Sequence, residues 1–181
     1  PQNLNCNILY NNSTNYPINA GTYNVDVTIV DSNYYGTTNA TMTIEKASAS
    51  IKLSNLHHIY DGTSKTAQID IQPIVNYNVS YNGDSNAITA GDYQLMVTIC
   101  DSNYFGSDSA VFTIEKAQAI FNISQTSVAY NGLPQSAEIS VVPSFTPFSV
   151  TYNNDTTLPT KSGIYQAAIT INDTNILGDT S

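Results

Sequence analysis

Residues 90–117, AGDYQLMVTICDSNYFGSDSAVFTIEKA, decide the architecture of this chain because nearly the same text occurs twice more. Residues 20–47 read AGTYNVDVTIVDSNYYGTTNATMTIEKA, identical at 17 of 28 positions, and a shortened copy, SGIYQAAITINDTNILGDTS, occupies residues 162–181. Gly21 and Gly91 are 70 residues apart, and Gly91 and Gly163 are 72 apart. A repeat of this length can enclose a small core of its own, so the chain is predicted to be a tandem array.

The repeat divides the chain into three segments. Residues 1–47 (the first repeat) are the C-terminal part of a unit, residues 48–117 (the second repeat) are a complete unit, and residues 118–181 (the third repeat) lack the last strand. The simplest interpretation is a segment of a longer array. The alternative is that neighbouring copies of the same array supply the missing strands by strand addition and so build a filament.

Apolar and polar residues alternate in five stretches of the second repeat, a pattern that predicts half-buried β-strands. Turn residues such as Asp61-Gly62 and Asn82-Gly83 end these stretches. We therefore expect an all-β chain of small immunoglobulin-like β-sandwiches of about 70 residues each, with a β-grasp-like variant as the alternative. The predicted inward-facing residues are Ala49, Ile51, Leu53, Ala67, Ile69, Ile71, Tyr77, Val79, Tyr81, Tyr93, Leu95, Val97, Ile99, Ala110, Phe112 and Ile114.

Successive repeats follow one another without a flexible linker. The sequence Ile-Glu-Lys-Ala at residues 44–47 and 114–117 leads directly into the next predicted strand. No run of Gly and Ser separates the repeats, so little slack is expected between them. The array is predicted to be stiff.

The charge balance excludes two classes of partner. Five lysines, no arginine and fourteen acidic residues give a net charge of −9. Nucleic acids and anionic lipids attract clustered Lys and Arg, so neither is an expected partner. No apolar run reaches the 18 or more residues of a membrane span, and no signal or lipidation motif occurs in the sequence. The abundance of Asn, Ser, Thr and Tyr is typical of secreted surface proteins.

A Gly-x-Tyr sequence opens the longest predicted strand of each repeat. The tyrosine is in phase with the core face, and its hydroxyl is predicted to bond to the backbone as a tyrosine corner. These structural residues are Gly21 and Tyr23, Gly91 and Tyr93, and Gly163 and Tyr165.

Asp and Asn recur two residues apart in the loop after that strand. An Asx turn, in which the Asp side chain accepts hydrogen bonds from amides further on, explains the Asp. The alternative is a calcium site, but calcium takes six or more oxygen ligands and no dense acidic cluster is present. We expect no cofactor, with calcium as the alternative. The candidate residues are Asp31, Asn33, Asp101, Asn103, Asp173 and Asn175.

Seven Asn-x-Ser/Thr sequences could carry glycans in an exported protein, although several would arise by chance in so Asn-rich a chain. They begin at Asn11, Asn12, Asn39, Asn78, Asn122, Asn154 and Asn172.

The other chemically active residues have structural interpretations. His57 and His58 are adjacent and point to opposite faces of an extended segment, so they do not form a catalytic pair. Cys6 is predicted to be a small core residue and Cys100 a surface thiol, without a disulfide between them. Lys46 and Lys116 are expected to be solvated rather than buried in an isopeptide bond.

Together these motifs resemble the YDG and MBG type repeats of large bacterial surface adhesins and other exported proteins. The resemblance covers essentially the whole chain. It is carried by Tyr60-Asp61-Gly62 and its counterpart Tyr130-Asn131-Gly132, and by the Ala-Gly-x-Tyr, Asp-Ser-Asn-Tyr-x-Gly and Ile-Glu-Lys-Ala sequences. The resemblance implies spacer modules that hold an adhesive or enzymatic tip away from the cell, and it implies no catalytic residues.

We therefore expect a structural, extracellular or cell-surface protein that forms a stalk, fibre or appendage, with adhesion as a further role. The alternative is a module that binds glycan or protein through exposed aromatic residues, for which Tyr34, Tyr35, Tyr104 and Phe105 are the candidates. An enzyme is not expected, because a chain with 10% charged residues offers few ionisable groups for an active site.

Overall fold

A computed structural model describes residues 3–178, and all of their regular structure consists of β-strands. None of these residues lies in a helix, which confirms the all-β prediction. Consequently no helix among them could cross a membrane. The outer ends of the first and third predicted repeats, residues 1–2 and 179–181, lie outside the described residues.

The described chain forms two compact units. One contains the described residues up to Lys52 together with Ile69–Val79 and Met96–Ser109. The other contains Leu53–Gln68, Ser80–Leu95 and the described residues from Ala110 onward. Because the division falls inside the second repeat, the joints between successive repeats each lie within a single unit.

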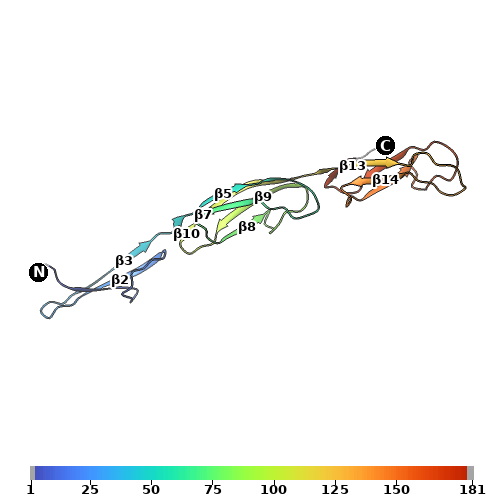
Figure 1. The fold of residues 1–181 in the computed structure, drawn as a ribbon. Coiled ribbons are helices and arrows are strands. Elements are labelled where there is room, and N and C mark those ends of the chain that lie inside the picture. Colours follow the sequence, from blue (N-terminus) through green and yellow to red (C-terminus); the bar gives the residue numbers. More distant parts are fainter. Residues whose placement is uncertain (1–2, 179–181) are drawn as a thin grey trace. The chain divides into compact units, whose positions relative to one another are not determined.

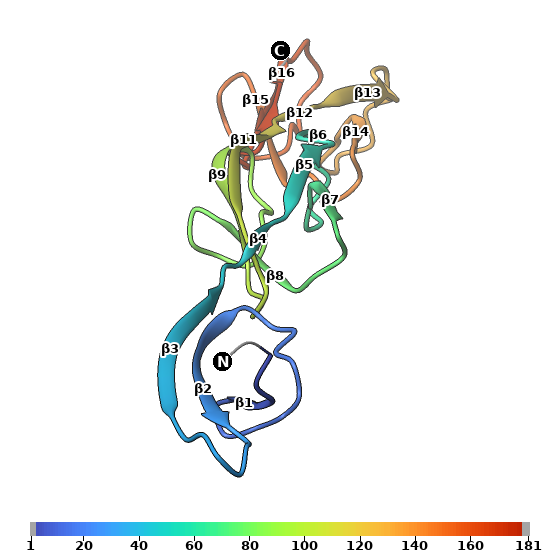
Figure 2. The same ribbon diagram turned by 90° about the vertical axis from the view of Figure 1, so that its left-hand side faces the viewer.

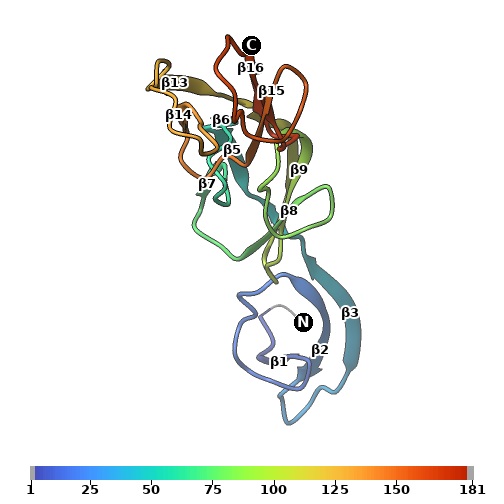
Figure 3. The same cartoon turned by 90° about the vertical axis from the view of Figure 1, so that its right-hand side faces the viewer.

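The first repeat forms an antiparallel sheet of three strands, β1 (Cys6–Tyr10), β2 (Gly21–Ile29) and β3 (Thr37–Ile44), in the order β1-β2-β3 (Figure 1). Figures 2 and 3 show the three strands side by side. Asn11 and Asn12, which directly follow β1, have φ angles of 45° and 65°, as a two-residue turn of type I′ between the bridged residues Tyr10 and Ser13 requires.

The second repeat contains three sheets. Four strands form the largest, in the order β6-β11-β9-β8, while β5 pairs with β7 and β4 pairs with β10. The strands are β4 (Ala47–Ser48), β5 (Ser50–Ser54), β6 (His57–Ile59), β7 (Gln68–Gln72), β8 (Tyr77–Tyr81), β9 (Gly91–Ile99), β10 (Tyr104–Phe105) and β11 (Ser107–Glu115).

The core of the second repeat follows the predicted alternation along β9 and β11. Leu95, Val97 and Phe112 have no exposed surface, whereas Met96, Thr98 and Val111, which alternate with them along β9 and β11, are exposed. The Phe112 ring contacts Tyr81 at a centroid distance of 5.0 Å. The Tyr81 hydroxyl in turn accepts a hydrogen bond of 2.9 Å from the backbone N–H of Ala67. This bond ties β8 to the segment before β7.

The predictions that Tyr77 faces the core and that Cys6 is a small core residue were both wrong, and the two residues occupy equivalent positions of the repeat. Tyr77 begins β8 and is 41% exposed, and the corresponding residues Cys6 and Phe148 are also exposed. The alternation of apolar and polar residues predicts which face of the strand a side chain lies on. It does not predict how far along the strand the opposing sheet still covers that face. The buried part of β8 therefore starts at Val79, which is partly buried.

The described part of the third repeat, up to residue 178, contains three strand pairs, β13-β14, β15-β16 and β12-β17. Its buried apolar residues include Val141, Tyr152, Ile169 and Ile176. The strands are β12 (Ala117–Gln118), β13 (Ile120–Ser124), β14 (Glu138–Val142), β15 (Phe148–Tyr152), β16 (Ala167–Ile171) and β17 (Ile176–Leu177). The immunoglobulin-like arrangement of the sheets stays a prediction.

Candidate functional site

The Asp of each Asp-x-Asn sequence closes an Asx turn. Asp31 Oδ1 accepts hydrogen bonds from the backbone N–H groups of Asn33 at 2.7 Å and Tyr34 at 3.2 Å. Asp101 Oδ1 accepts the same two bonds, at 2.7 Å and 3.1 Å, in the second repeat. In the third, Asp173 Oδ1 accepts from both the backbone and the side-chain nitrogen of Asn175, each at 2.8 Å. The Asp side chain thus holds the loop in one conformation.

The Asn of the same sequence reaches the preceding repeat. Asn103 Oδ1 accepts a hydrogen bond of 2.7 Å from the backbone N–H of Ala20, and Asn103 Nδ2 donates one of 3.1 Å to Asn19 Oδ1. Asn175 Oδ1 accepts the equivalent bond, 2.9 Å, from the backbone N–H of Ala90. In both cases the donor stands directly before the Gly-x-Tyr sequence of the preceding repeat. Two side chains at the same position of the repeat therefore make the same crossing bond.

Short parallel strands fix the connecting segment to the following repeat. In the first joint, β4 pairs with β10, and the backbone N–H groups of Ala47 and Ala49 donate to the carbonyls of Asn103 and Phe105, each at 2.9 Å. Lys46 Nζ adds a hydrogen bond of 2.7 Å to the carbonyl of Asp101. We refer to residues 19–20, 46–49 and 101–105 as the first joint.

The second joint, residues 89–90, 116–119 and 173–177, repeats this pairing. Strand β12 pairs with β17 in the same parallel register, with Ala117 opposite Ile176. The N–H groups of Ala117 and Ala119 donate to the carbonyls of Asn175 at 3.0 Å and Leu177 at 2.7 Å. Ile176 and Leu177 stand where the second repeat has the aromatic residues Tyr104 and Phe105, and the backbone pairing is the same with either pair.

The second joint also has an apolar cluster. Ala117, Ala119, Val141 and Ile176 are buried together, and partly buried Tyr60, Phe121 and Ile171 pack against them. Tyr60 of the second repeat also meets Phe145 of the third edge to face, with ring centroids 6.1 Å apart. In the first joint the equivalent residues are less buried, because Ala47 is exposed and Tyr104 is half-buried.

The tyrosines of the Gly-x-Tyr sequences form three similar corners. The hydroxyls of Tyr23, Tyr93 and Tyr165 donate to the carbonyls of Asn19 at 2.8 Å, Thr89 at 2.8 Å and Lys161 at 3.1 Å. Each bond fixes the backbone four residues earlier, and for Tyr23 and Tyr93 this is next to the donor of the crossing bond. The corner and the Asn therefore act on the same short segment at each joint.

The Tyr-Asp-Gly sequence of the second repeat forms a charged turn. Asp61 Oδ1 accepts a hydrogen bond of 2.9 Å from the backbone N–H of Thr63, and its other oxygen forms an ion pair with Lys65. The bond from Lys65, followed by those from Thr63, holds the pKa of Asp61 well below its ordinary value. In the third repeat Asn131 makes uncharged bonds to the backbone N–H of Leu133 and the side chain of Gln135.

The remaining candidates lie apart from one another. Among residues 3–178, no group of three or more His, Cys, Asp and Glu side chains comes together. His58 packs its ring on Phe112 at a centroid distance of 5.1 Å, and Cys100 is exposed as predicted. The Asn residues of all seven glycosylation sequences are exposed, although the Asn11 side chain accepts a hydrogen bond from the backbone N–H of Asn24.

The candidate aromatic residues behave differently in the first two repeats. Tyr34 and Tyr35 of the first repeat are exposed, Tyr35 almost completely at 98%. Their counterparts Tyr104 and Phe105 form β10 and pair with β4 in the first joint. The two aromatic positions therefore form part of a joint in the second repeat, where the preceding repeat is present to pair with them.

A family model of the MBG domain matches the chain three times in succession, at residues 1–48, 49–118 and 119–181. No curated protein matches the chain, and no solved structure does. The match confirms the resemblance drawn from the Tyr-Asp-Gly, Ala-Gly-x-Tyr and Ile-Glu-Lys-Ala sequences.

Proposed function

Because this chain belongs to the MBG domain family, whose repeats are modules typical of surface proteins, we propose that it is a structural spacer of an extracellular or cell-surface protein. Its role is mechanical rather than catalytic. It forms part of a stalk, fibre or appendage and can present an adhesive region. In an exported protein, the exposed Asn-x-Ser/Thr sequences are available for glycosylation.

One observation carries this proposal: both joints are built in the same way. Each has a parallel two-residue strand pair, and each has an Asn side chain that accepts an N–H bond from the preceding repeat. The segment between two repeats is thus hydrogen-bonded to the following repeat, and the following repeat is hydrogen-bonded to the preceding one. Such a connection limits bending between the repeats more than a free linker would. A repeated stiff joint serves a spacer, whereas a single binding site needs no repetition.

Each complete repeat is proposed to be a small immunoglobulin-like sandwich. In the second repeat the pair β5-β7 is one layer and the sheet β6-β11-β9-β8 is the other. Buried residues on strands of both sheets support this arrangement, namely Ile71 on β7 and Leu95 and Phe112 on β9 and β11. The partners are then neighbouring repeats, with neither nucleic acid nor membrane insertion involved.

The two cysteines allow a direct test of joint stiffness. Cys6 in the first repeat and Cys100 in the second are both free and exposed, so each can take a nitroxide spin label without substitution. Pulsed electron paramagnetic resonance then measures the distribution of distances between the labels. We expect a single narrow distribution, and Cys6→Ser and Cys100→Ser chains control for labels on other molecules. A distribution as broad as that of a flexible linker contradicts the proposal.

A second candidate function, binding of glycan or protein, has one observation in its favour. Tyr10, Tyr16 and Tyr23 line a hollow of about 320 Å³ in the first repeat, with the rings of Tyr10 and Tyr16 5.7 Å apart. Aromatic faces are common contacts in binding sites. A glycan array probed with the chain and with a Tyr16→Ala variant tests this candidate. If the candidate is correct, the chain binds at least one glycan on the array and the variant does not.

A further inference from the structure

The first and last strands of the second repeat are paired in parallel at two places. Strand β4 pairs with β10, with Ala47 opposite Tyr104. Strand β6 pairs with β11, with His57 opposite Thr113. Strands β4 and β6 belong to the beginning of the repeat and β10 and β11 to its end. Each parallel pair therefore ties the beginning of the repeat directly to its end.

Tension along the array loads these pairs lengthwise. The preceding repeat connects to β4 through Glu45 and Lys46, and β11 connects to the following repeat through Lys116. A pull on the two connections draws one strand of each pair toward the start of the chain and the other toward its end. Because the strands run parallel and their hydrogen bonds are evenly spaced, the bonds lengthen together. An antiparallel pair pulled from two adjacent ends opens one bond at a time instead.

Backbone hydrogen bonds close both ends of the β6-β11 pair. The N–H of Thr113 donates to the carbonyl of Leu56, and the N–H of Tyr60 donates to the carbonyl of Glu115, each at 2.8 Å. The β4-β10 pair has the two bonds of 2.9 Å already described for the first joint. A lengthwise pull on the repeat therefore acts on both sets of bonds.

Buried side chains support the β6-β11 pair from the core side. Ile114 of β11 is 1% exposed, and the ring of His58 on β6 packs on Phe112 at a centroid distance of 5.1 Å. The Thr113 hydroxyl donates a hydrogen bond of 2.7 Å to Asp92 Oδ1 and so ties β11 to β9. Backbone bonds that are shielded from water on one face are electrostatically stronger than fully solvated ones.

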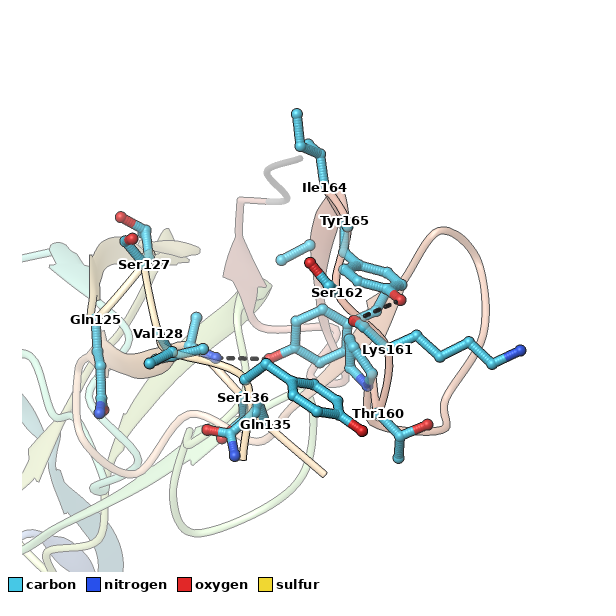
Figure 4. A pocket seen from close by; sticks show the side chains of 18 of the residues that line it. Gln125, Ser127, Val128, Gln135, Ser136, Thr160, Lys161, Ser162, Ile164 and Tyr165 are labelled. Atoms are coloured by element: carbon cyan, nitrogen blue, oxygen red, sulfur yellow. Dashed lines mark hydrogen bonds between the residues drawn. The ribbon is translucent and has the colours of Figure 1, made fainter. Parts of the chain in front are cut away.

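The third repeat shows what the last strand contributes. This repeat lacks its last strand, and its described residues line an open groove of about 550 Å³ at the corresponding place. Val128 and Tyr165, the counterparts of His58 and Tyr93, lie on opposite walls of the groove (Figure 4). In the second repeat Phe112 of β11 contacts both His58 and Tyr93, at centroid distances of 5.1 and 6.4 Å. The last strand therefore joins the beginning of the repeat to the rest of its core.

We propose that the pairs β4-β10 and β6-β11, here called the tension clamp, enable the second repeat to resist unfolding when the array is pulled along its length. Forced unfolding is governed by the unfolding rate rather than by equilibrium stability, so the direction of the pull decides the resistance. The biological use of the clamp rests on the spacer function, whereas the resistance itself does not.

Single-molecule pulling with optical tweezers tests the proposal on the whole chain. Cys6 and Cys100 are replaced by serine, and DNA handles are attached through two introduced cysteines. The shear geometry uses Glu45→Cys and Lys116→Cys, two exposed positions on either side of the clamp. Unfolding in this geometry releases up to about 250 Å of chain, which identifies the event as opening of the second repeat.

The unzipping geometry uses Asn76→Cys and Ser102→Cys in the same background. These exposed residues flank two adjacent ends of β8 and β9, which are antiparallel, as the bonds from Cys100 N–H to the Asn76 carbonyl and from Asn82 N–H to the Gln94 carbonyl show. At the same constant force the shear geometry should give a lifetime at least about tenfold longer, because two or more further hydrogen bonds must break in one step.

A proline substitution shows whether the clamp is the source of the resistance. Ala49→Pro removes the N–H that donates to the Phe105 carbonyl, so it should shorten the shear lifetime at least about fivefold and leave the unzipping lifetime unchanged. Ser48→Pro is the matched control. The N–H of Ser48 lies between the two donors Ala47 and Ala49 and points away from β10, so this change should affect neither lifetime.

The lifetimes decide the outcome. A longer lifetime in shear that falls only with Ala49→Pro supports the proposal. Equal lifetimes in the two geometries overturn it, as does an Ala49→Pro chain whose two lifetimes both shorten or both stay the same. If Ala49→Pro prevents folding, the comparison of the two geometries without it decides alone. A broad distribution of spin-label distances would contradict the spacer function and leave this comparison unaffected.

Discussion

Replacement of Asn103 by alanine should open the first joint without disturbing the loop that carries the residue. The substitution removes the bonds to Ala20 N–H at 2.7 Å and to Asn19 Oδ1 at 3.1 Å, while the Asx turn of Asp101 uses only backbone groups of the loop. Ala20 is half-buried, so its N–H is poorly placed to bond with water instead. A net hydrogen bond contributes about 1 kcal/mol, and an unsatisfied donor costs more. We expect a loss of about 1–2 kcal/mol.

Limited digestion with trypsin measures this loss at the joint itself. The chain has five lysines and no arginine, and Lys46 lies in the first joint with its Nζ bonded to the carbonyl of Asp101. Cleavage after Lys46 requires local opening of the joint, and at low protease concentration its rate follows the open population. A loss of about 1–2 kcal/mol therefore corresponds to a cleavage rate about 5–30 times higher.

The chain offers a matched control in Asn33→Ala. Asn33 occupies the same position in the first repeat and its backbone N–H bonds to Asp31 in the same way, but its side chain makes no bond to another repeat within the described residues. Cleavage after Lys46 should be unchanged in this variant. If the two variants accelerate cleavage equally, or if Asn103→Ala does not accelerate it, the assignment of Asn103 to the joint is wrong.

Three further predictions concern the turns. Gly106→Ala should lower the free energy of unfolding, measured by urea denaturation, by about 1–3 kcal/mol, because the new Cβ would lie 3.0 Å from the backbone oxygen of Ala49. Gly36→Ala is the control and should lower it less, because its Cβ would meet only the end of the Ile29 side chain. The folded-state pKa of Asp61 is lowered below its ordinary 3.8, so the turn's ion pair with Lys65 stabilises the fold above pH 4 and is lost as the pH falls further. A carboxyl titration by NMR should show a midpoint under 3.8 that Lys65→Met raises. Addition of calcium or of a chelator should leave the melting temperature unchanged, since the Asx oxygens already accept backbone bonds; a rise of several degrees with calcium would favour a metal site.

The strand core could be read from the sequence because alternation is a local property. Leu95, Val97 and Phe112 lie in extended segments long enough for their parity to be unambiguous, and all three are buried. Tyr77 has the same parity as Val79 but begins its strand, and no local pattern states where the opposing layer stops. The prediction therefore failed at the end of a strand rather than in its middle.

The role of the Asn in the joints could not be derived in the same way. Asn103 bonds to Ala20, a residue 83 positions earlier, and such a distant contact leaves no local signature. A signal was nevertheless present. An Asx turn needs only the Asp, yet Asn also recurs at residues 33, 103 and 175, while the residue between them changes from Ser to Thr in the third copy. Recurrence beyond what the turn requires could have indicated a second task for that side chain.

The two joints share their hydrogen bonds but differ in burial, and this difference predicts an order of opening. Opening the second joint exposes Ile176, which is 5% exposed, together with Ala117 and Ala119, whereas the first joint has half-buried Tyr104 and exposed Ala47 at the equivalent positions. Burial of an Ile side chain contributes about 1.5–3 kcal/mol. Lys116 stands in the second joint where Lys46 stands in the first, so one digest compares both.

In the unsubstituted chain, trypsin should cleave after Lys46 at least about tenfold faster than after Lys116, because the smaller free energy of opening gives a larger open population. Asn175→Ala removes the crossing bond of the second joint and should accelerate cleavage after Lys116 alone, leaving Lys46 as it was. The difference between the two sites should narrow in this variant, because the crossing bond is lost while the apolar cluster is untouched. Equal rates in the unsubstituted chain would mean that the cluster adds nothing to the second joint, and its stability would then rest on backbone pairing and the Asn bond alone.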